Sequence, residues 1–377
     1  MTWGIVTLTA NGLHLGLRVR EVLQGEATLY APEKVCHFYR EKFIGRGLHP
    51  SSTSYSSNLS SIEMIKGSFK DFVKSIYPKH RYMVFIMAAG IVVRSLEGLL
   101  EHKSKDPGIM VMDEKGAFIV PILSGHMGGA NEMAVMLGER LEATPVITTA
   151  SDVQGKLAVD MLAEKLGSVF EDFRAATKVS GKIVNGEEVF LFTEIPLPQW
   201  VEKYFPVFHC TRENIRKEAA KHSGGKIILS HRRLKPTQGE NPDDWIQLYP
   251  QCLIIGIGAR KNISADHVRK SIEKVLEEFD YNPLSIKHFA TVDVKEKEAG
   301  IIEGIKGYNR PLRIISREDI KAVEGKFQGS DFVKKTLGIS AVAEPAAYCS
   351  SSKNGEFILG KRKIEGLTLA LWKENDH

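Results

Sequence analysis

The chain has 377 residues, of which 43% are hydrophobic, and its 51 basic and 46 acidic residues give a formal net charge of +5. This length exceeds one compact domain and supports two or three hydrophobic cores. The basic residues are interleaved with acidic ones, which argues against a nucleic-acid-binding protein. No apolar run approaches the ~18 to 20 residues that span a bilayer, and the first residues lack a signal-peptide pattern. We therefore expect a cytoplasmic protein that has neither nucleic acid nor a membrane as a partner.

The spacing of cysteine and histidine gives no sign of a metal site or a disulfide framework. The 12 histidines form no His-x-x-x-His pair, and the 4 cysteines form no Cys-x-x-Cys pair. Structural zinc sites draw their ligands from such closely spaced pairs. We therefore expect no metal bound by protein side chains.

Strand and helix patterns alternate through the first part of the chain. This alternation predicts a largely parallel sheet that is covered by helices on both faces. The residues 113–116 have the composition of a tight hairpin-like connection, and the serine-rich run 51–61 is expected to be a mobile loop. The predicted strands cover 4–9, 27–30, 82–87, 108–112, 118–123 and 146–149, and the predicted helices cover 13–23, 62–76, 130–141 and the turn that carries Arg94.

A polar segment with proline and glycine, 235–242, has the composition of a linker, and we place a domain boundary there. After it the alternation restarts, with predicted strands at 252–257, 286–292, 312–315 and 367–372 and predicted helices at 265–279 and 295–305. The expected fold class is α/β, with two or three α/β domains that have mostly parallel sheets covered by helices. The expected parts are an N-terminal α/β domain at 1–150, a middle region and linker at 151–240, and a C-terminal α/β domain at 250–377.

The most informative feature is a glycine-rich loop, SGHMGGAN, at 124–131. A predicted strand leads directly into it, and a predicted helix follows it. Glycines allow a backbone to approach a ligand closely, and a helix start leaves N–H groups without helical partners. His126 is a candidate base, and Ser124 and Asn131 add polar groups, so we favour a functional loop over a purely structural turn. Ser124 lies outside a Gly-x-Ser-x-Gly elbow, so a turn or N-cap role is at least as plausible for it as a nucleophilic one.

Four small-residue segments follow predicted strands: 87–90, 124–131, 149–152 and 256–261. Ligands of open α/β sheets bind beyond the carboxyl ends of the strands, so we expect these segments to converge on one crevice. The loop 124–131 is no phosphate-binding loop of the Walker A type, because no Gly-Lys-Ser/Thr follows. The segment 256–261 lacks the third glycine of a dinucleotide fingerprint and carries Arg260 and Lys261, which favours an acidic ligand over NAD.

Several motifs occur together in a recognisable order and spacing. They are MAAGIVVR at 87–94, KDP at 105–107, VMDEKG at 111–116, SGHMGGAN at 124–131, PVITTASD at 145–152, IIGIGARK at 254–261, VKEKEAG at 294–300 and VAEPAA at 342–347. In these motifs the chain resembles the CbiG family of anaerobic cobalamin (vitamin B12) biosynthesis, the cobalt-precorrin-5A hydrolases. The resemblance spans nearly the whole chain and is weakest at 168–245.

The resemblance implies a substrate, cobalt-precorrin-5A, which is a corrin-like tetrapyrrole with acetate and propionate arms. It implies opening of the ring A acetate lactone and release of a two-carbon fragment as acetaldehyde, which leaves cobalt-precorrin-5B. The cobalt then belongs to the substrate, so we expect no cofactor. Other enzymes of the pathway are the further partners to consider.

The resemblance supports the reaction, and the residue roles are our own hypotheses. We assign catalysis to His126 as general base, Asn131 for orienting water or the carbonyl, and Ser124, with backbone N–H groups of 128–130 stabilising the oxyanion. For Glu298 and Glu344 a helix-start role is about as plausible as a ligand role, and a surface salt bridge is the default for Arg94, Lys105 and Asp106. The candidate substrate-binding residues are Gly90, Arg94, Lys105, Asp106, Gly128, Gly129, Asp152, Gly256, Gly258, Arg260, Lys261, Glu298 and Glu344.

Two other classes of protein fit the same residues. One is a non-catalytic tetrapyrrole-binding or delivery protein of the same pathway, in which the crevice only holds the macrocycle. The other is a nucleotide- or sugar-acid-binding α/β enzyme that shares only the fold. Release of acetaldehyde distinguishes the hydrolase from both.

Overall fold

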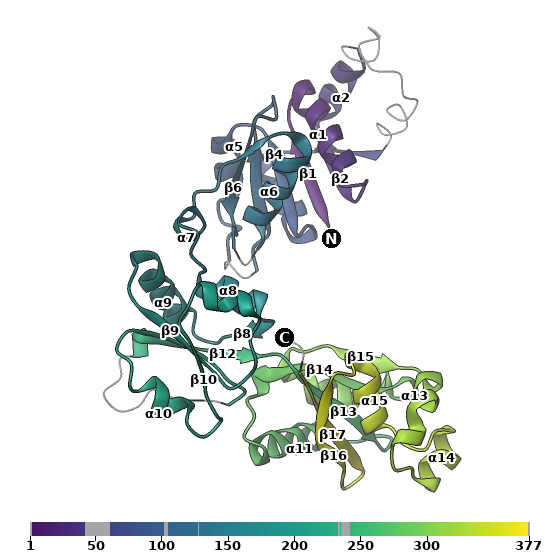
Figure 1. Ribbon diagram of the computed structural model, residues 1–377. Coiled ribbons are helices and arrows are strands. Elements are labelled where there is room, and N and C mark those ends of the chain that lie inside the picture. The colour runs from purple at the N-terminus through teal and green to yellow at the C-terminus, as the bar shows by residue number, and fades with distance from the viewer. Residues whose placement is uncertain are drawn as a thin grey trace. The chain divides into compact units, whose positions relative to one another are not determined.

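A computed structural model describes residues 2–41, 61–101, 105–126, 128–232, 234 and 242–375 (Figure 1). The chain divides into two compact units, Met1–Lys156 and Leu157–His377. Unit 1 contains one sheet and unit 2 contains two, and most neighbouring strands are parallel. The predicted α/β fold is therefore confirmed. The predicted loop at 51–61 falls outside the described residues, except for its last position.

Unit 1 is built on a seven-stranded sheet with the order β3-β2-β1-β4-β5-β6-β7. Every neighbouring pair is parallel except β5 and β6, which are antiparallel. Strands β1 and β4 are buried along their whole length, as expected for central strands covered on both faces. The strands are β1 (Trp3–Thr7), β2 (Ala27–Ala31), β3 (Ile62–Met64), β4 (Tyr82–Ile86), β5 (Gly108–Met112), β6 (Phe118–Leu123) and β7 (Thr144–Pro145).

Helices cover both faces of this sheet, because alternate residues of its strands point into two separate cores. Ile5 and Val84 pack with α1 and α6, whereas Val6 and Phe85 pack with α4 and α5. The helices are α1 (Ala10–Val22), α2 (Glu33–Tyr39), α4 (Phe69–Ile76), α5 (Ala89–Ser95), α6 (Ala130–Leu141) and α7 (Ala150–Val153).

The predicted helix 62–76 is wrong in its first half. Residues Ile62–Met64 pair with β2 as strand β3, and helix α4 begins only at Phe69. Two local signals separate them, a positive φ of 73° at Gly67 and the side chain of Ser68, which accepts a hydrogen bond from the N–H of Asp71. The predicted strand 146–149 is also displaced, since β7 ends at Pro145.

The first sheet of unit 2 has the order β10-β9-β11-β12-β8, in which only β8 is antiparallel to its neighbour. Its main helix is preceded by the N-cap residue Asp172, whose side chain accepts a hydrogen bond from the N–H of Ala175, and is followed by the C-cap residue Gly186, with a φ of 78°. The strands are β8 (Ser168–Val169), β9 (Val189–Thr193), β10 (Val207–His209), β11 (Gly225–Leu229) and β12 (Trp245–Pro250), and the helices are α8 (Val159–Lys165), α9 (Phe173–Asn185) and α10 (Ile215–Ala219).

The segment that we interpreted as a linker between domains joins two strands of this one sheet. Residues 235–241 are not among those described, but β11 and β12 on either side of them are parallel neighbours. The change from one sheet to the next occurs instead at Gln251 and Cys252, between β12 and β13. Composition alone cannot separate a domain linker from a polar connection between strands.

The second sheet of unit 2 has the order β15-β14-β13-β17-β16, with β16 and β17 antiparallel to their neighbours. The predicted helix 295–305 is shorter than expected: Lys295 ends a 3₁₀ turn, and the helix begins only at Ala299, after its N-cap residue Glu298. The strands are β13 (Leu253–Ala259), β14 (Ile286–Val292), β15 (Leu312–Ile315), β16 (Gly355–Ile364) and β17 (Leu367–Glu374), and the helices are α11 (Ala265–Glu278), α12 (Ala299–Ile305), α13 (Arg317–Val323), α14 (Asp331–Leu337) and α15 (Ala343–Ser350).

Two glycines of β13 allow α15 to pack closely on the sheet. A Cβ added at Gly256 would lie 1.9 Å from the carbonyl oxygen of Ala343, and one at Gly258 would lie 3.3 Å from Cβ of Val342. We therefore expect Gly256→Ala to destabilise unit 2 by about 1–3 kcal/mol. The matched change Gly181→Ala meets nothing within 4 Å in helix α9 and is expected to be neutral or stabilising. Thermal unfolding followed by circular dichroism measures both, and equal midpoints would contradict this packing role.

A buried chain of polar side chains joins the two sheets of unit 2. Nδ1 of His231 lies 3.1 Å from Oε1 of Glu194, and Nε2 lies 3.0 Å from Sγ of Cys252. Burial favours a raised pKa for the Glu194 carboxyl, but hydrogen bonds from His231 and Ser230 bring that pKa down to about 2. Burial lowers the pKa of His231 and raises the pKa of the Cys252 thiol to about 12. The group therefore consists of a carboxylate, a neutral imidazole and an unreactive thiol.

The group of Glu194, His231 and Cys252 predicts that the protein loses stability in acid. The pKa of His231 is lowered in the folded state, so its contribution is complete above its unfolded value of 6.5 and is lost as the pH falls below it. The contribution of Glu194 is lost at lower pH, from 4.5 toward about 2. We expect His231→Asn, which removes the titrating ring, to flatten the decline of the unfolding midpoint just below pH 6.5. The exposed control His209→Asn should leave the decline unchanged, and a decline that is the same in all three proteins would contradict this account.

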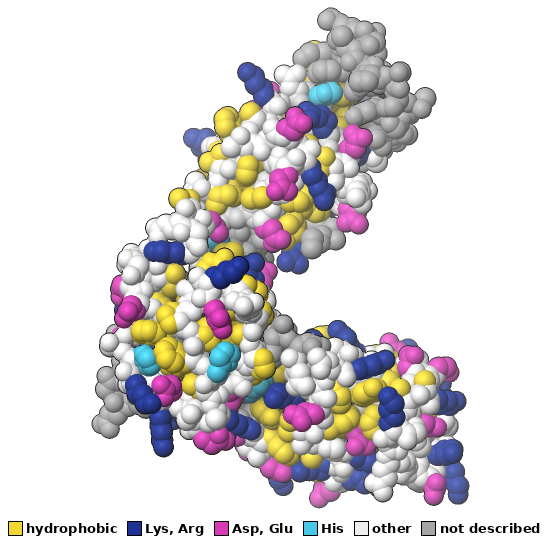
Figure 2. Space-filling model, viewed as in Figure 1, with side chains coloured by type: hydrophobic (Ala, Val, Ile, Leu, Met, Phe, Trp, Pro, Cys, Tyr) yellow, Lys and Arg dark blue, Asp and Glu magenta, His cyan; other side chains and the backbone are white. Residues whose placement is uncertain are grey.

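Charged side chains of both signs share the surface of the protein (Figure 2). Figure 2 shows cationic and anionic side chains interspersed over the visible face, without a continuous basic stripe. In the described ranges, no helix combines the length and the apolar character needed to cross a bilayer.

Candidate functional site

The glycine-rich loop 124–131 lies at the edge of the unit 1 sheet where the parallel strands begin. Strand β6 runs opposite to β5, so its last residue, Leu123, pairs with Ile109 near the start of β5. The loop then packs beside the starts of β4 and β5. A Cβ added at Gly129 would lie 2.8 Å from the hydroxyl of Tyr82, and one added at Gly108 would lie 2.9 Å from the carbonyl oxygen of Gly128.

The segment 87–90 lies at the opposite edge, because it follows the end of β4. The 5 residues of β4 separate the two edges by roughly 15 Å. The prediction that 87–90 converges with the loop is therefore wrong, and the physical reason is the reversed direction of β6. Gly90 is exposed there, and Arg94 is exposed with its guanidinium 3.4 Å from the carbonyl oxygen of Gly90. Their assignment to a substrate site with His126 is not supported by this geometry.

The predicted convergence of 149–152 with the loop is confirmed. Nε2 of His126 lies 2.9 Å from Oδ2 of Asp152, and the two side chains are 13% and 24% exposed. The hydroxyl of Ser151 lies 3.2 Å from the same nitrogen. The imidazole is thus mostly enclosed, and its Nε2 side faces a carboxylate and a hydroxyl.

Asn131 supports this pair from the start of helix α6. Its amide nitrogen donates to Oδ2 of Asp152 at 2.7 Å and to the hydroxyl of Thr149 at 3.0 Å. An amide nitrogen has two hydrogens, so both are already engaged. The role of Asn131 in orienting water or the carbonyl stays a prediction, and its amide nitrogen holds Asp152.

Ser124 and Asp106 shape the loop. The hydroxyl of Ser124 donates to the carbonyl oxygen of Asp106 at 3.0 Å, and Ser124 has a positive φ of 55°. The buried Asp106 carboxylate accepts the N–H of Glu101 at 3.0 Å. These contacts favour the turn role of Ser124 over a nucleophilic one. Lys105 is exposed at this same edge, 3.5 Å from a carboxylate oxygen of Glu101.

The loop closes through its own backbone. The N–H of Gly129 donates to the carbonyl oxygen of His126 at 2.7 Å, and the N–H of Ala130 donates to that of Ser124 at 3.1 Å. Two of the three N–H groups expected to stabilise an oxyanion are therefore already engaged in the turn. A Cβ at Gly128 would lie 2.2 Å from Cβ of Ser124, so glycine is required there for the turn itself.

The predicted site residues of unit 2 make structural contacts. The packing of α15 accounts for Gly256 and Gly258. Glu298 accepts the N–H of Asn262 at 2.8 Å and lies 3.3 Å from Nζ of Lys295, and Glu344 accepts the N–H of Lys361 at 3.0 Å. Arg260 and Lys261 are exposed after β13. A ligand role for these six residues stays a prediction, as does their convergence with the loop.

Two residues of the site were not assigned from the sequence, Thr149 and Ser151. Both belong to the motif at 145–152, which supplied only Asp152 to the candidates. Thr149 and Ser151 come after an extended segment that lies beside β6. This position in the sequence could have identified them as site residues. Among the residues described, no group of three or more His, Cys, Asp or Glu side chains is arranged to hold a metal ion.

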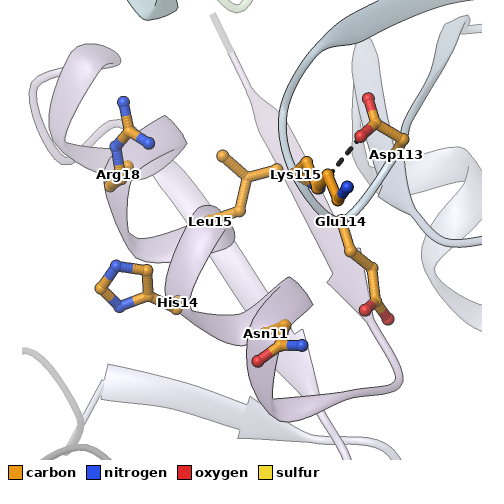
Figure 3. A pocket seen from close by; sticks show the side chains of 7 residues that line it. All are labelled: Asn11, His14, Leu15, Arg18, Asp113, Glu114 and Lys115. Carbon is orange, nitrogen blue, oxygen red and sulfur yellow. Dashed lines mark hydrogen bonds between the residues drawn. The ribbon is translucent and has the colours of Figure 1, made fainter.

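A hollow of about 480 Å³ lies elsewhere in unit 1, between helix α1 and the turn after β5. Figure 3 shows His14 and Arg18 on the helix and Asp113 to Lys115 on the turn. Asp113 accepts the N–H of Lys115 at 3.0 Å, and Glu114 accepts the hydroxyl of Thr9. Asp113 thus closes the turn, Glu114 connects it to the N-cap residue of α1, and the residues that line the hollow do not include His126.

Three family models match the chain in succession. They are the cobalamin synthesis G N-terminal region at 71–152, the cobalamin biosynthesis central region at 157–250, and the cobalamin synthesis G C-terminus at 253–372. The cobalt-precorrin-5A hydrolase of Priestia megaterium is 31% identical over 339 residues, which cover 87% of this chain and 90% of the relative. The chain belongs to the CbiG family. The family assignment made from the sequence motifs is therefore confirmed.

Other relatives cover most of the chain as well. The cobalt-precorrin-5A hydrolase of Salmonella typhimurium is 31% identical over 81% of this chain and 85% of the relative. A solved structure of a cobalamin biosynthesis protein G homolog from Sulfolobus solfataricus is 21% identical, with coverage of 99% of this chain and 97% of that one and a TM-score of 0.37. The N-terminal CbiG region contains every residue of the His126 network.

Proposed function

We propose that this chain is a cobalt-precorrin-5A hydrolase, which opens the ring A acetate lactone and releases acetaldehyde to leave cobalt-precorrin-5B. Relatives that carry this name match across all three CbiG regions. The observation that connects the proposal to a particular site is the contact between His126 of the loop and Asp152 of helix α7. It places a candidate base next to a carboxylate within the family's N-terminal region.

The reaction requires two steps. Water adds to the lactone carbonyl and the acyl C–O bond breaks, which gives the ring A carboxylic acid and a free hydroxyl on the two-carbon fragment. The hydroxyl then loses its proton to a base, and the bond between this fragment and the macrocycle breaks. Its electron pair passes into the macrocycle, which takes up a proton, and acetaldehyde leaves.

His126 supplies the base for the second step. An imidazole accepts a proton near neutral pH, and a carboxylate beside it stabilises the imidazolium that forms. The contact of 2.9 Å to Asp152 provides this stabilisation. Lys105 is an exposed cation at the same edge of the sheet, and its ion pair with Glu101 is long and exposed, so turning toward a substrate carboxylate costs little.

Anaerobic incubation with purified cobalt-precorrin-5A and an aldehyde trap tests this function. We expect one acetaldehyde for each macrocycle converted and no aldehyde without the protein. Saturable binding of the macrocycle without any aldehyde would replace the hydrolase with a tetrapyrrole-binding or delivery protein. The absence of both binding and turnover would remove the proposed substrate.

A further inference from the structure

Asp152 contacts His126, whereas the sequence suggested only a substrate contact for it. A single oxygen, Oδ2, lies 2.9 Å from Nε2 of His126 and 2.7 Å from the amide nitrogen of Asn131. We propose that Asp152, held by Asn131 and Thr149, is a positioning residue that fixes His126 in the tautomer with its proton on Nε2. This inference rests on the proposed function for its effect on turnover.

The tautomer follows from the hydrogen-bonding groups around Nε2. An ionised carboxylate only accepts hydrogen bonds, so a ring nitrogen 2.9 Å from it must carry the hydrogen. The Ser151 hydroxyl, 3.2 Å from the same nitrogen, can accept as well as donate and does not oppose this arrangement. With Nε2 protonated, Nδ1 is the basic atom of the ring, and it takes the proton from the substrate hydroxyl.

The position of Asp152 is itself fixed by the fold. Asn131 is buried in the first turn of the 12-residue helix α6, so its amide has a defined direction. Its second hydrogen bond, to the hydroxyl of Thr149, keeps the amide nitrogen turned toward 149–152. A Cβ at Gly125 would lie 2.7 Å from Oδ1 of Asn131, so this loop glycine leaves room for the amide. Gly125 and the start of helix α6 thus both help to orient the imidazole of His126.

Asp152→Asn tests the inference through a readout that does not depend on activity. The asparagine nitrogen can donate to Nε2 when the Asn131 amide turns its oxygen toward residue 152, where the Thr149 hydroxyl can donate to that oxygen, and the ring proton then moves to Nδ1. Nitrogen-15 NMR at about pH 8 with labelled histidine, assigned by comparison with His126→Gln, should report the Nε2–H tautomer in the wild type. Asp152→Asn should shift His126 toward the Nδ1–H form. The control Asp331→Asn, which changes an exposed carboxylate of unit 2, should leave it unaltered.

Turnover then shows whether this positioning matters for the reaction. We expect Asp152→Asn to lower kcat by about 10²-fold or more with little change in KM, since a wrongly protonated imidazole cannot accept the substrate proton. Thr149→Val, which removes one support of Asn131, should give a smaller loss in the same direction.

The outcomes separate the inference from the proposed function. An Nδ1–H tautomer in the wild type overturns the inference even if no variant folds, and so does an unchanged tautomer in folded Asp152→Asn. A shifted tautomer with unchanged kcat overturns the positioning role in catalysis. A wild type without hydrolase activity refutes the proposed function, and the NMR comparison still decides the tautomer.

Discussion

Replacing His126 with alanine should lower kcat for acetaldehyde release by at least about 10²-fold, with little change in KM, because general bases typically contribute ~10²–10⁴. The imidazole faces Asp152, and the hydrogen bonds that close the loop from Gly129 to His126 and from Ala130 to Ser124 join main-chain groups. Removal of the ring should therefore leave the sheet and the loop backbone in place. Steady-state kinetics and thermal unfolding measure the two effects separately.

His37→Ala is the matched control, since His37 is exposed on helix α2 of the same unit. It should retain wild-type kinetics. Wild-type turnover in folded His126→Ala would remove this residue from the mechanism. Restoration of activity by added imidazole would support a missing proton acceptor.

Gly128→Ala should reduce activity by about 10²-fold while it changes the unfolding midpoint little. The added Cβ would overlap Cβ of Ser124, so the turn must open and displace His126, and a shift of about 1 Å at a reacting group has this cost. Ser124 and Gly128 lie at an edge of the sheet and belong to neither of its two cores, which limits the effect on folding.

Gly90→Ala is the comparison, because its Cβ would meet only a flexible guanidinium nitrogen of Arg94, at 3.6 Å. That protein should keep full activity, since Gly90 lies at the other edge of the sheet. If Gly128→Ala melts earlier and yet turns over normally when folded, the glycine serves only the structure. If Gly90→Ala loses activity with an unchanged fold, the site extends to an edge that we have excluded.

Regular elements could be predicted from the sequence wherever local signals agreed. The bounds of β5, β6, α6, β14 and β15 match the predicted ranges, because apolar runs end there at turn residues or loops. The range 62–76 failed because its apolar residues fit one helical face, while pairing with β2 decided the first three. Strand pairing is a long-range interaction, and the periodicity of apolar residues along the sequence does not reveal it.

The location of the loop could not be predicted from strand patterns alone. The hairpin at 113–116 was expected. Because it reverses the chain, β6 is antiparallel to β5 and ends at the edge opposite to the end of β4, and this consequence was not foreseen. The partners of His126 were similarly hidden, since Asp152 lies 26 residues further along the chain. The glycines of β13 resembled a ligand-binding motif, but the contact that explains Gly256 comes from Ala343, far away in sequence.

A single anaerobic turnover in oxygen-18 water tests most directly whether this chain hydrolyses the lactone. Mass spectrometry of the macrocycle and of the trapped aldehyde follows both products. We predict one labelled oxygen in the ring A carboxyl group of each product macrocycle, together with one acetaldehyde. Acetaldehyde without label in the macrocycle would contradict attack of water on the lactone carbonyl, and a macrocycle that is bound and recovered unchanged would contradict hydrolysis altogether.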